Sequence, residues 1–424
     1  MPHSITAEFS LNTPLFSSGA DPNSPELRVS EIKAALRFWW RAMNYGLYAK
    51  DPARFVDVES QLFGSASASY GQGVLVALVN VMNLSEKGPT GEVYQEFVGR
   101  PGARYLAYGL MAFAYSGRTT PPTQEAQLQR GCLKPGGTFK IRLNWKSEVT
   151  RSRVHKTATL CDADFEAQLI QALKTFGTFG GLGSRSRRGY GSVTLQTLEN
   201  EDVTPWIVAN DAAAMKATAE NLLIDQRKSP HHVPADIKYS AFTCLSRCTV
   251  FSLDTEPAPT PYQLLNAMGS AFVRYRAWGR YGQILNQEPS NKIFKADHDW
   301  FRGPADKEFT HPHRIVFGLP LPYSDNLVWG GRETRRASPL FFHIHKATPN
   351  LYLGLMFDLR SQFLAPSACG GRATIADPRT NLPVTITPDW SMLDELHDGA
   401  IPTRRSKALR PISLIDGITC TRIF

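Results

Sequence analysis

Residues 180–191 read Gly-Gly-Leu-Gly-Ser-Arg-Ser-Arg-Arg-Gly-Tyr-Gly, a glycine-rich loop that carries three arginines. The segment before the loop predicts a helix, because apolar residues recur at helical spacing from Phe165 to Phe176. Gly177 favours the end of this helix. Residues 192–198, directly after the loop, predict a strand. The loop therefore connects a helix to a strand within one folded unit.

The residues upstream of the loop supply the other elements of that unit. Alternating apolar and polar residues predict strands at 5–11 and 139–145, and an apolar run predicts a buried strand at 74–81. Apolar residues at helical spacing predict a helix that follows Ser30 as its N-cap. The order is strand, helix, strand, strand, helix, strand, as in a ferredoxin-like or RRM-like domain. Residues 83–137 form a large insertion in this order.

The second half of the chain begins in a similar way. A strand pattern at 237–253 precedes an amphipathic helix that includes Leu264 and Tyr275. Further strands are predicted at residues 314–319, 340–345 and 351–357. Each half also contains a Gly/Arg segment, and the later one ends in Arg335 and Arg336. We interpret this as a divergent tandem duplication.

These patterns predict an α+β fold with two tandem ferredoxin-like domains that carry insertions. The N-terminal domain spans residues 1–205, and a linker helix and connector occupy residues 206–234. The C-terminal domain spans residues 235–424. A length of 424 residues fits two domains of ordinary size.

The composition favours a cytoplasmic protein with an anionic partner. The formal net charge is +9, and no strongly basic amphipathic segment indicates a membrane surface, so nucleic acid is the preferred partner. Residues 1–11 lack the features of a signal peptide, and no apolar stretch approaches the roughly 20 residues that span a bilayer. Six scattered cysteines do not form a disulfide scaffold.

The glycine-rich loop is the strongest candidate site. Glycines such as Gly183 and Gly189 let backbone amides approach a phosphate, while arginines supply forked donors, and these arginines are Arg185, Arg187 and Arg188. The loop partly matches the RNP1 pattern of RNA-binding sheets and leaves Tyr190 as its one candidate for stacking on a base. A mobile hairpin with solvated arginines is the alternative, but so many arginines among glycines favour a function.

The first helix carries a basic stripe as well. Lys33, Arg37 and Arg41 recur every four residues opposite the apolar face, with Arg28 upstream. They can follow successive phosphates or form a solvated helix face, and composition alone leaves both interpretations open. Trp40 and its neighbour Trp39 are expected in the core.

A further basic cluster follows the strand at 139–145 and includes Arg151 and Arg153. His155 within it raises the alternative of a metal-independent ribonuclease, with this histidine as acid/base. A histidine near arginines is more often a phosphate contact. Histidines and cysteines do not occur at metal-ligand spacing, and no P-loop motif is present, so we expect no metal or cofactor.

Several of these motifs resemble one family. The segments 12–16, 19–21, 26–28 and 32–42 are similar to the N-terminal signature of the first RAMP subunit of the type III-B (Cmr) CRISPR complex. The loop at 180–192 resembles the glycine-rich loop that RAMP proteins share. Segments 317–320 and 335–340 also look like this family, so the resemblance covers both halves of the chain.

The resemblance implies two RAMP domains in a non-catalytic subunit that holds the 3′ part of the guide RNA. Other RAMP subunits would be its protein partners, and target RNA is a second possible ligand. It further implies RNA contacts at the helix stripe and at the arginines of the loop. The competing hypothesis is a RAMP-type endoribonuclease that processes precursor CRISPR RNA, although such nucleases usually have the loop near the C-terminus.

Overall fold

In the computed structural model, the chain folds around two antiparallel four-stranded sheets. The residues that the structure describes are 3–48, 51–66, 70–113, 126–153, 159–199, 205–228, 245–253, 258–277, 283–284, 288–289, 294–302, 311–319, 321–323, 326–328, 335–360, 374–377, 382–386, 388–398 and 418–422. His155 and the glycines at 330 and 331 lie outside these residues. Among the described residues, no helix has the length and the apolar character needed to cross a membrane.

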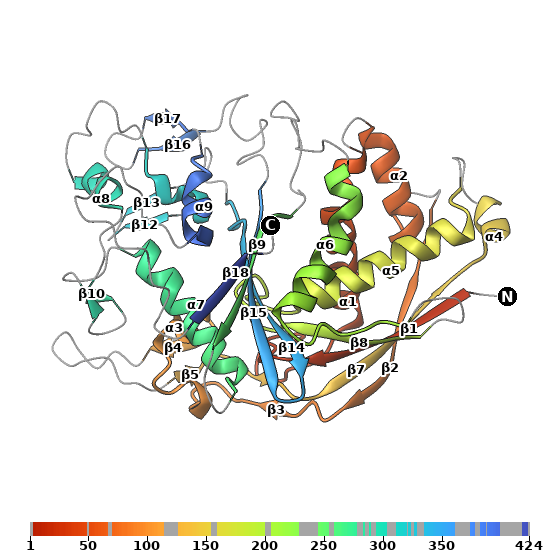
Figure 1. Cartoon of the computed structure of the whole chain (residues 1–424), viewed down its shortest axis with the longest axis horizontal. Coiled ribbons are helices and arrows are strands. Elements are labelled where there is room, and N and C mark those ends of the chain that lie inside the picture. Colours follow the sequence, from red (N-terminus) through yellow and green to blue (C-terminus); the bar gives the residue numbers. More distant parts are fainter. Residues whose placement is uncertain are drawn as a thin grey trace.

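The first unit has the ferredoxin-like order predicted from the sequence. Its elements are β1 (His3–Leu11), α1 (Val29–Asn44), β2 (Leu75–Met82), β7 (Thr138–Trp145), α5 (Asp162–Phe179) and β8 (Val193–Glu199). The sheet order is β2-β7-β1-β8, and every pairing is antiparallel. Helices α1 and α5 cover one face of this sheet, next to α6 (Ala212–Lys228), as Figure 1 shows.

Helix α5 continues beyond the end that the sequence suggested. It passes through Gly177 and stops at Phe179, with Gly180 as its C-cap. A Cβ atom on Gly177 would lie 2.3 Å from Cβ of Leu195 in β8. The glycine is therefore needed for the close approach of helix and sheet, and it does not end the helix.

Strand β2 also differs from the prediction, because it is an edge strand and not a buried one. Among the described strands it pairs only with β7, and four of its apolar residues are exposed: Leu75, Val79, Val81 and Met82. An apolar run does not distinguish a central strand from an edge strand, since both can be rich in Val and Leu.

The second unit repeats the same topology. Its elements are β9 (Leu245–Leu253), α7 (Pro261–Arg276), β14 (Leu340–Thr348), β15 (Leu351–Leu359), α9 (Ser391–Asp398) and β18 (Ile418–Arg422). The order β14-β15-β9-β18 places the first strand of the unit between the third and the fourth, as in the first sheet. The α+β fold with two ferredoxin-like units is thus confirmed. The strand expected at 314–319 is wrong, because His313–Phe317 forms a 3₁₀-helix, η3, in which Arg314 binds the buried Asp297.

The insertion in the first unit forms a small subdomain that contacts the second unit. It contains β3 (Glu86–Lys87), η2 (Gln95–Phe97), α3 (Pro101–Leu106), β4 (Met111–Phe113), β5 (Ala126–Leu128) and β6 (Cys132–Leu133). Helix α3 packs on α7 where two glycines meet. A Cβ on Gly102 would lie 2.2 Å from O of Asn266, and one on Gly269 would lie 2.1 Å from O of Gly102.

The remaining described elements are short. They are η1 (Tyr45–Tyr48), α2 (Pro52–Phe63), α4 (Glu148–Ser152), β10 (Gln283–Ile284), β11 (Glu288–Pro289), α8 (Lys295–Arg302), β12 (Leu321–Tyr323), β13 (Asn326–Val328), β16 (Thr374–Ala376) and β17 (Pro383–Thr385). The linker helix was expected in residues 206–234, and α6 lies within this range.

The two units share one core. Trp39 of α1 contacts Phe357 of β15, with ring centroids 5.9 Å apart, and Phe341 of β14 stacks on the same Phe357. Across the joint, Asn12 donates from Nδ2 to O of Ile344, and N of Ile344 donates to Oγ of Ser192. The units therefore form one body, and the domain limits at residues 205 and 235 stay predictions.

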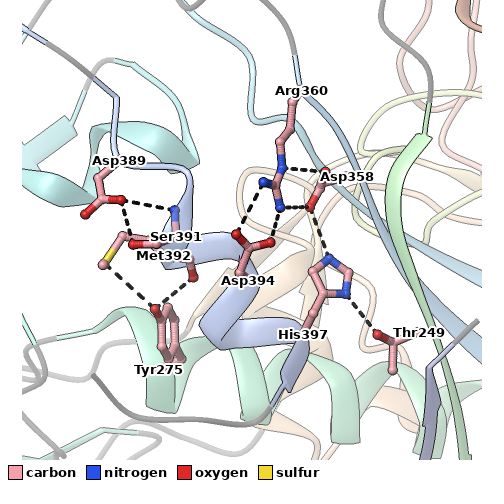
Figure 2. A network of polar contacts seen from close by, with 9 residues as sticks. All are labelled: Thr249, Tyr275, Asp358, Arg360, Asp389, Ser391, Met392, Asp394 and His397. Carbon is pink, nitrogen blue, oxygen red and sulfur yellow. Dashed lines mark hydrogen bonds and ion pairs between the residues drawn. The ribbon is translucent and has the colours of Figure 1, made fainter. Parts of the chain in front are cut away.

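A buried polar network fixes α9 to the second sheet (Figure 2). Arg360 donates to both carboxylate oxygens of Asp358 and reaches Asp394 of α9, with Nη2 and Oδ1 2.5 Å apart. His397 of α9 lies between Asp358 and Thr249, at 3.3 Å from Oδ2 and 2.9 Å from Oγ1. Asp358 has no exposed surface, so its charge is stable there only because these partners surround it.

Candidate nucleic-acid interface

The glycine-rich loop is held on the segment that follows β1. N of Ser184 donates to O of Phe16, and N of Gly191 donates to O of Pro14, both at 2.9 Å. The hydroxyl of Thr13 donates to O of Gly189 at 2.7 Å. The loop and the segment 12–16 are therefore one structural unit, although they lie far apart in the sequence.

Two of the glycines predicted to belong to the site are required by the backbone. Gly183 has a φ of +76°, and a Cβ there would lie 2.6 Å from Cδ1 of Leu15. Gly189 has a φ of +81°, and a Cβ there would lie 2.7 Å from Cδ2 of Leu265. Both positions combine a left-handed backbone with close packing, so another residue would strain the loop.

The loop also docks on the second unit. N of Phe342 donates to O of Arg187, and Nη1 of Arg187 donates to O of Ser338. The Arg187 guanidinium lies 4.8 Å from the ring centroid of Phe341, and that of Arg188 lies 4.9 Å from the ring of Phe272. The loop therefore packs against the second unit and forms part of the joint between the two units.

The arginines of the loop share one electrostatic property. Among the described residues, no carboxylate contacts Arg185, Arg187 or Arg188. Burial, together with the charge of Arg276, lowers the pKa of Arg188 to about 10. Its Nη1 atom is buried and has no hydrogen-bond partner in the described part of the chain. A group of cations that repel one another favours an anionic ligand.

The second Gly/Arg segment reaches this same group. Burial, together with the charge of Arg187, lowers the pKa of Arg336 to about 10. Arg336 is half-buried and Arg335 is exposed. The structure thus brings the ends of the two Gly/Arg segments close together.

A polar groove of about 460 Å³ opens beside the loop, at the N-terminus of α1. Arg28 and Arg130 line it, together with Ser30, Glu31 and Ser184. The Arg28 side chain makes no capping hydrogen bond at the start of α1, and the positive end of the helix dipole points into this region. The groove can therefore accept an anion such as a phosphate.

Glu31 has a structural role in the groove. Its two oxygens accept from N of Gly183 and from Oγ of Ser17, both at 2.6 Å. Arg130 donates from Nη1 to Oγ of Ser184 at 3.2 Å. Glu31 thus fixes the glycine-rich loop to α1, and the two arginines keep the groove positive.

The α1 stripe lies in a different environment. Glu59 of α2 is almost fully buried and accepts from Nε of Arg37 and Nε of Arg41, both at 2.5 Å. Lys33 donates from Nζ to the carbonyl oxygens of Gln72 and Val74. The sequence left RNA contact and a solvated face open for the stripe, and in the structure its cations bind α2 and the segment before β2. The core face of α1 is as predicted, with Trp39 and Trp40 buried.

The basic cluster after β7 is divided by the structure. Arg151 is buried: it donates to O of Leu160 and to Asp162, and it lies 4.2 Å from the ring centroid of Phe165. It supports the fold and offers no donor surface to RNA, which corrects its placement among the contacts. Arg153 is exposed, but α4 follows the end of β7 that pairs with His3, and the loop lies at the opposite end, roughly 25–30 Å away along β1.

Tyr190 is also corrected as a stacking residue. Its side chain has no exposed surface, and its hydroxyl donates to O of Ala103 at 2.8 Å. The ring packs against Phe16 and Phe97. A ring enclosed in this way has no face for a base, so Tyr190 instead attaches the loop to the insertion.

The sheet face opposite the helices does not resemble the RNA-binding face of an RRM. Its central strands present Thr6 and Glu8 on β1 and Lys140 and Arg142 on β7. Lys140 pairs with Glu199 of β8 at 3.0 Å. The described part of this face has no aromatic residue on which a base could stack, so an RRM-like mode of RNA binding is not favoured.

The network in Figure 2 contains a hydroxyl, an imidazole and a carboxylate in a row: Thr249, His397 and Asp358. These three residue types also form catalytic triads. All three are buried here. We therefore assign the arrangement to the stability of the second unit. In the described part of the chain, no group of three His, Cys, Asp or Glu could hold a metal.

Sequence reasoning missed two residues near the loop. Tyr108 lies beside Arg185, and Arg276 of α7 contributes to the charge at Arg188. Tyr108-Gly109 lies within the apolar stretch 105–115, where only the glycine indicates a turn. No local pattern distinguishes Arg276 from other cations at a helix C-terminus.

Known proteins share this fold and these sequence features. The model of the RAMP superfamily matches residues 8–194, which include the glycine-rich loop. The CRISPR system Cmr subunit Cmr1-1 of Pyrococcus furiosus is 26% identical over 320 residues, which are 76% of this chain and 76% of that protein. Cmr subunit Cmr1-2 of the same organism is 26% identical over 193 residues, 44% of this chain and 91% of that protein.

A solved structure agrees with the architecture. The crystal structure of apo Cmr1 from Pyrococcus furiosus superposes with a TM-score of 0.50 at 17% identity, and the match covers 85% of this chain and 89% of that chain. At this identity the likeness concerns the fold, which is the tandem arrangement described above. The sequence matches support a Cmr1-like RAMP subunit, with the RAMP superfamily model matched over residues 8–194.

Proposed function

We propose that this protein is a non-catalytic, RNA-binding subunit of a type III-B CRISPR effector complex. It holds the sugar-phosphate backbone of guide RNA near its 3′ region, of target RNA, or of both. Its curated relatives are named as Cmr subunits, so neighbouring RAMP subunits are the expected protein partners, in the cytoplasm. The net charge of +9 fits an anionic ligand.

One observation carries this proposal: the arginines of the glycine-rich loop lack carboxylate partners among the described residues. Arginines that only support a fold are usually paired, as Arg151 is with Asp162. Cations held together without counter-charges stabilise a bound polyanion, because the ligand relieves their mutual repulsion. A phosphate backbone supplies such charges at regular spacing.

We assign the primary contacts to the loop and the groove. Arg185 is exposed, Arg187 and Arg188 are half-buried, and Arg28 and Arg130 line the adjacent groove. Arg335 and Arg336 extend the same positive surface. Lys33, Arg37 and Arg41 are secondary, because protein acceptors already hold them, and Arg153 is remote from the loop.

The test measures binding and cleavage in one sample. The full-length protein is mixed with labelled single-stranded RNA that carries a CRISPR repeat sequence, at salt concentrations between about 50 and 200 mM. We expect tight binding with little sequence preference. Four phosphate contacts give a slope of log affinity against log salt of about −3, since each contributes roughly −0.7 for a single strand. An affinity that is independent of salt would contradict the proposal.

The same sample tests the nuclease alternative. We expect intact RNA with or without Mg²⁺ or Mn²⁺, because Glu31, the carboxylate that lines the groove, already accepts from Ser17 and Gly183, and the described residues hold no metal-ligand cluster. Cleavage that is lost in His155→Ala and persists in His3→Ala would instead assign the protein to the endoribonucleases. His3 is a suitable control because it is a half-buried histidine that stacks on Trp145, far from the loop.

A further inference from the structure

Tyr108 is presented to solvent by a well-defined turn. N of Leu110 donates to O of Ala107 at 2.7 Å, and Gly109 has a φ of +81°, as the third residue of a type II turn requires. Tyr108 occupies the second position of this turn and is 70% exposed. Among the large hydrophobic residues exposed in the described part of the chain, it is the only aromatic one.

Arg185 lies against this exposed ring. Its guanidinium carbon is 5.7 Å from the ring centroid of Tyr108, and its Nη2 atom is 3.4 Å from where a Cβ on Gly109 would lie. Arg185 is one of two described non-glycine residues with positive φ, at +64°, and its carbonyl accepts from N of Arg188. A non-glycine residue in this conformation is strained, and such residues concentrate at functional sites.

The surroundings identify the kind of ligand. Arg185 directly follows Ser184, which lines the polar groove and binds Arg130. An anion in the groove would therefore contact the residue next to Arg185, whose guanidinium lies over the Tyr108 ring. A ligand that combines a phosphate with an adjacent flat ring fits this arrangement, and a nucleotide in single-stranded RNA has both.

We propose that Tyr108 and Arg185 form a stacking platform for one unpaired base of the RNA strand whose phosphates bind the loop and groove. This inference rests on the proposed function and adds a base contact to it. Arg185 covers one face of the Tyr108 ring, and the base stacks on the exposed face. Stacking on a ring tolerates every base, which agrees with little sequence preference. A base paired in a duplex cannot reach the ring, so the platform selects single strands.

A protein partner is the competing ligand for an exposed tyrosine, since tyrosine is common at the centres of protein interfaces. The environment favours RNA. Arg185 adjoins Tyr108 and its turn without a carboxylate among the described residues, and the groove beside the loop is polar. An interface with a protein is usually depleted of charge at its core.

The experiment compares three probes on the full-length protein: a uridine oligonucleotide of ordinary RNA, an oligonucleotide of the same length and charge with abasic sugars, and a duplex RNA. The variants are Tyr108→Ala, Tyr108→Phe and the control Val149→Ala. Val149 is 64% exposed on α4, far from the loop, so this variant also truncates an exposed apolar side chain. Melting temperatures verify that each variant is folded.

We expect Tyr108→Ala to bind the uridine oligonucleotide about tenfold more weakly, with an unchanged salt slope, and the abasic probe as the wild type does. Tyr108→Phe and Val149→Ala keep the wild-type affinity for every probe. Equal losses for the two single strands, or no loss at all, would overturn the platform. If the wild type still binds RNA with a steep salt dependence, the proposed function survives that result; a wild type that binds no RNA overturns both.

Discussion

The α1 stripe and the glycine-rich loop are both basic, and they lie within the same unit, yet the structure surrounds them differently. Glu59, which is almost fully buried, forms ion pairs with both Arg37 and Arg41 of the stripe, so its charge offsets part of theirs. The arginines of the loop contact aromatic rings and one another, without a carboxylate in the described residues. The number of positive charges is therefore a weaker indication of a ligand site than the absence of counter-charges around them.

The loop has a structural role besides the proposed role in RNA binding. Its backbone joins β14 of the second unit and the segment 12–16 of the first unit, while Arg185 is exposed and Arg187 and Arg188 are half-buried. A site built on such a joint is rigid, so the arginines are held in place before a ligand binds. In the α1 stripe, by contrast, the charged groups themselves make the structural contacts, because they hold α2.

The largest effect is expected where the stripe loses its counter-charge. Glu59→Ala leaves Arg37 and Arg41 without their carboxylate and should lower the free energy of unfolding by about 3 kcal/mol, measured by chemical denaturation. RNA affinity should not fall, because no positive charge is removed. Glu199→Ala is the control, since its pair with Lys140 is largely exposed and contributes less than about 1 kcal/mol. A stable Glu59→Ala protein would show that the stripe does not depend on Glu59.

The strand on which the loop docks should be sensitive to acid. Burial lowers the pKa of His343 to about 3 and that of His345 to about 4, whereas both titrate near 6.5 when unfolded. The unfolded state therefore binds more protons, and stability is lost as the pH falls below about 6.5. As the pH falls from 6.5 to 5, each histidine should lower the free energy of unfolding by roughly 1.5 kcal/mol. Chemical denaturation at each pH measures this loss.

A single substitution separates this effect from other acid titrations. We expect His345→Gln to lose about half of the pH dependence of stability between pH 6.5 and 5, because His343 still contributes the other half. The glutamine retains a donor for O of Ala209, which His345 contacts through Nε2 at 2.9 Å. If the pH dependence is the same in wild type and variant, then carboxylates account for it.

The third prediction compares one substitution at two arginines. Arg188→Met keeps apolar contact with Phe272 but removes the charge, so RNA affinity should drop about tenfold while the melting temperature stays or rises. Arg151→Met should do the opposite, since it breaks the pair with Asp162 and loses about 3 kcal/mol of stability, with unchanged RNA affinity in binding titrations. Identical behaviour of the two variants would remove the distinction between paired and unpaired cations.

The smallest effect is expected in the groove. Arg28 is half exposed and has a weak pair with Glu26, so Arg28→Ala should reduce RNA affinity about threefold and lower the magnitude of the salt slope by about 0.7. Arg153→Ala, at the far end of the sheet, is the matched control and should change neither quantity. Salt titrations of both variants would show whether the groove or only the loop contacts phosphate.

Local patterns were sufficient for much of the fold. Helical spacing of apolar residues placed α1 and its buried face, and alternation placed β1 and β7, because these signals depend on neighbours a few residues away. The ends of elements were harder to predict. Gly177 suggested the end of α5, but the glycine is there because the helix approaches Leu195 closely. The sequence could not show this, since Leu195 approaches only in the folded chain.

By itself, the sequence determined the tandem order of elements, the glycine-rich loop and the excess of positive charge. Only the tertiary structure decided which of those charges are neutralised. It placed Glu59 against the stripe, Asp162 against Arg151, and Tyr108 beside Arg185. It also buried Tyr190, which the sequence had suggested as a stacking residue. The reason is physical: helix and strand patterns arise from local periodicity, whereas burial and charge compensation depend on contacts between distant segments.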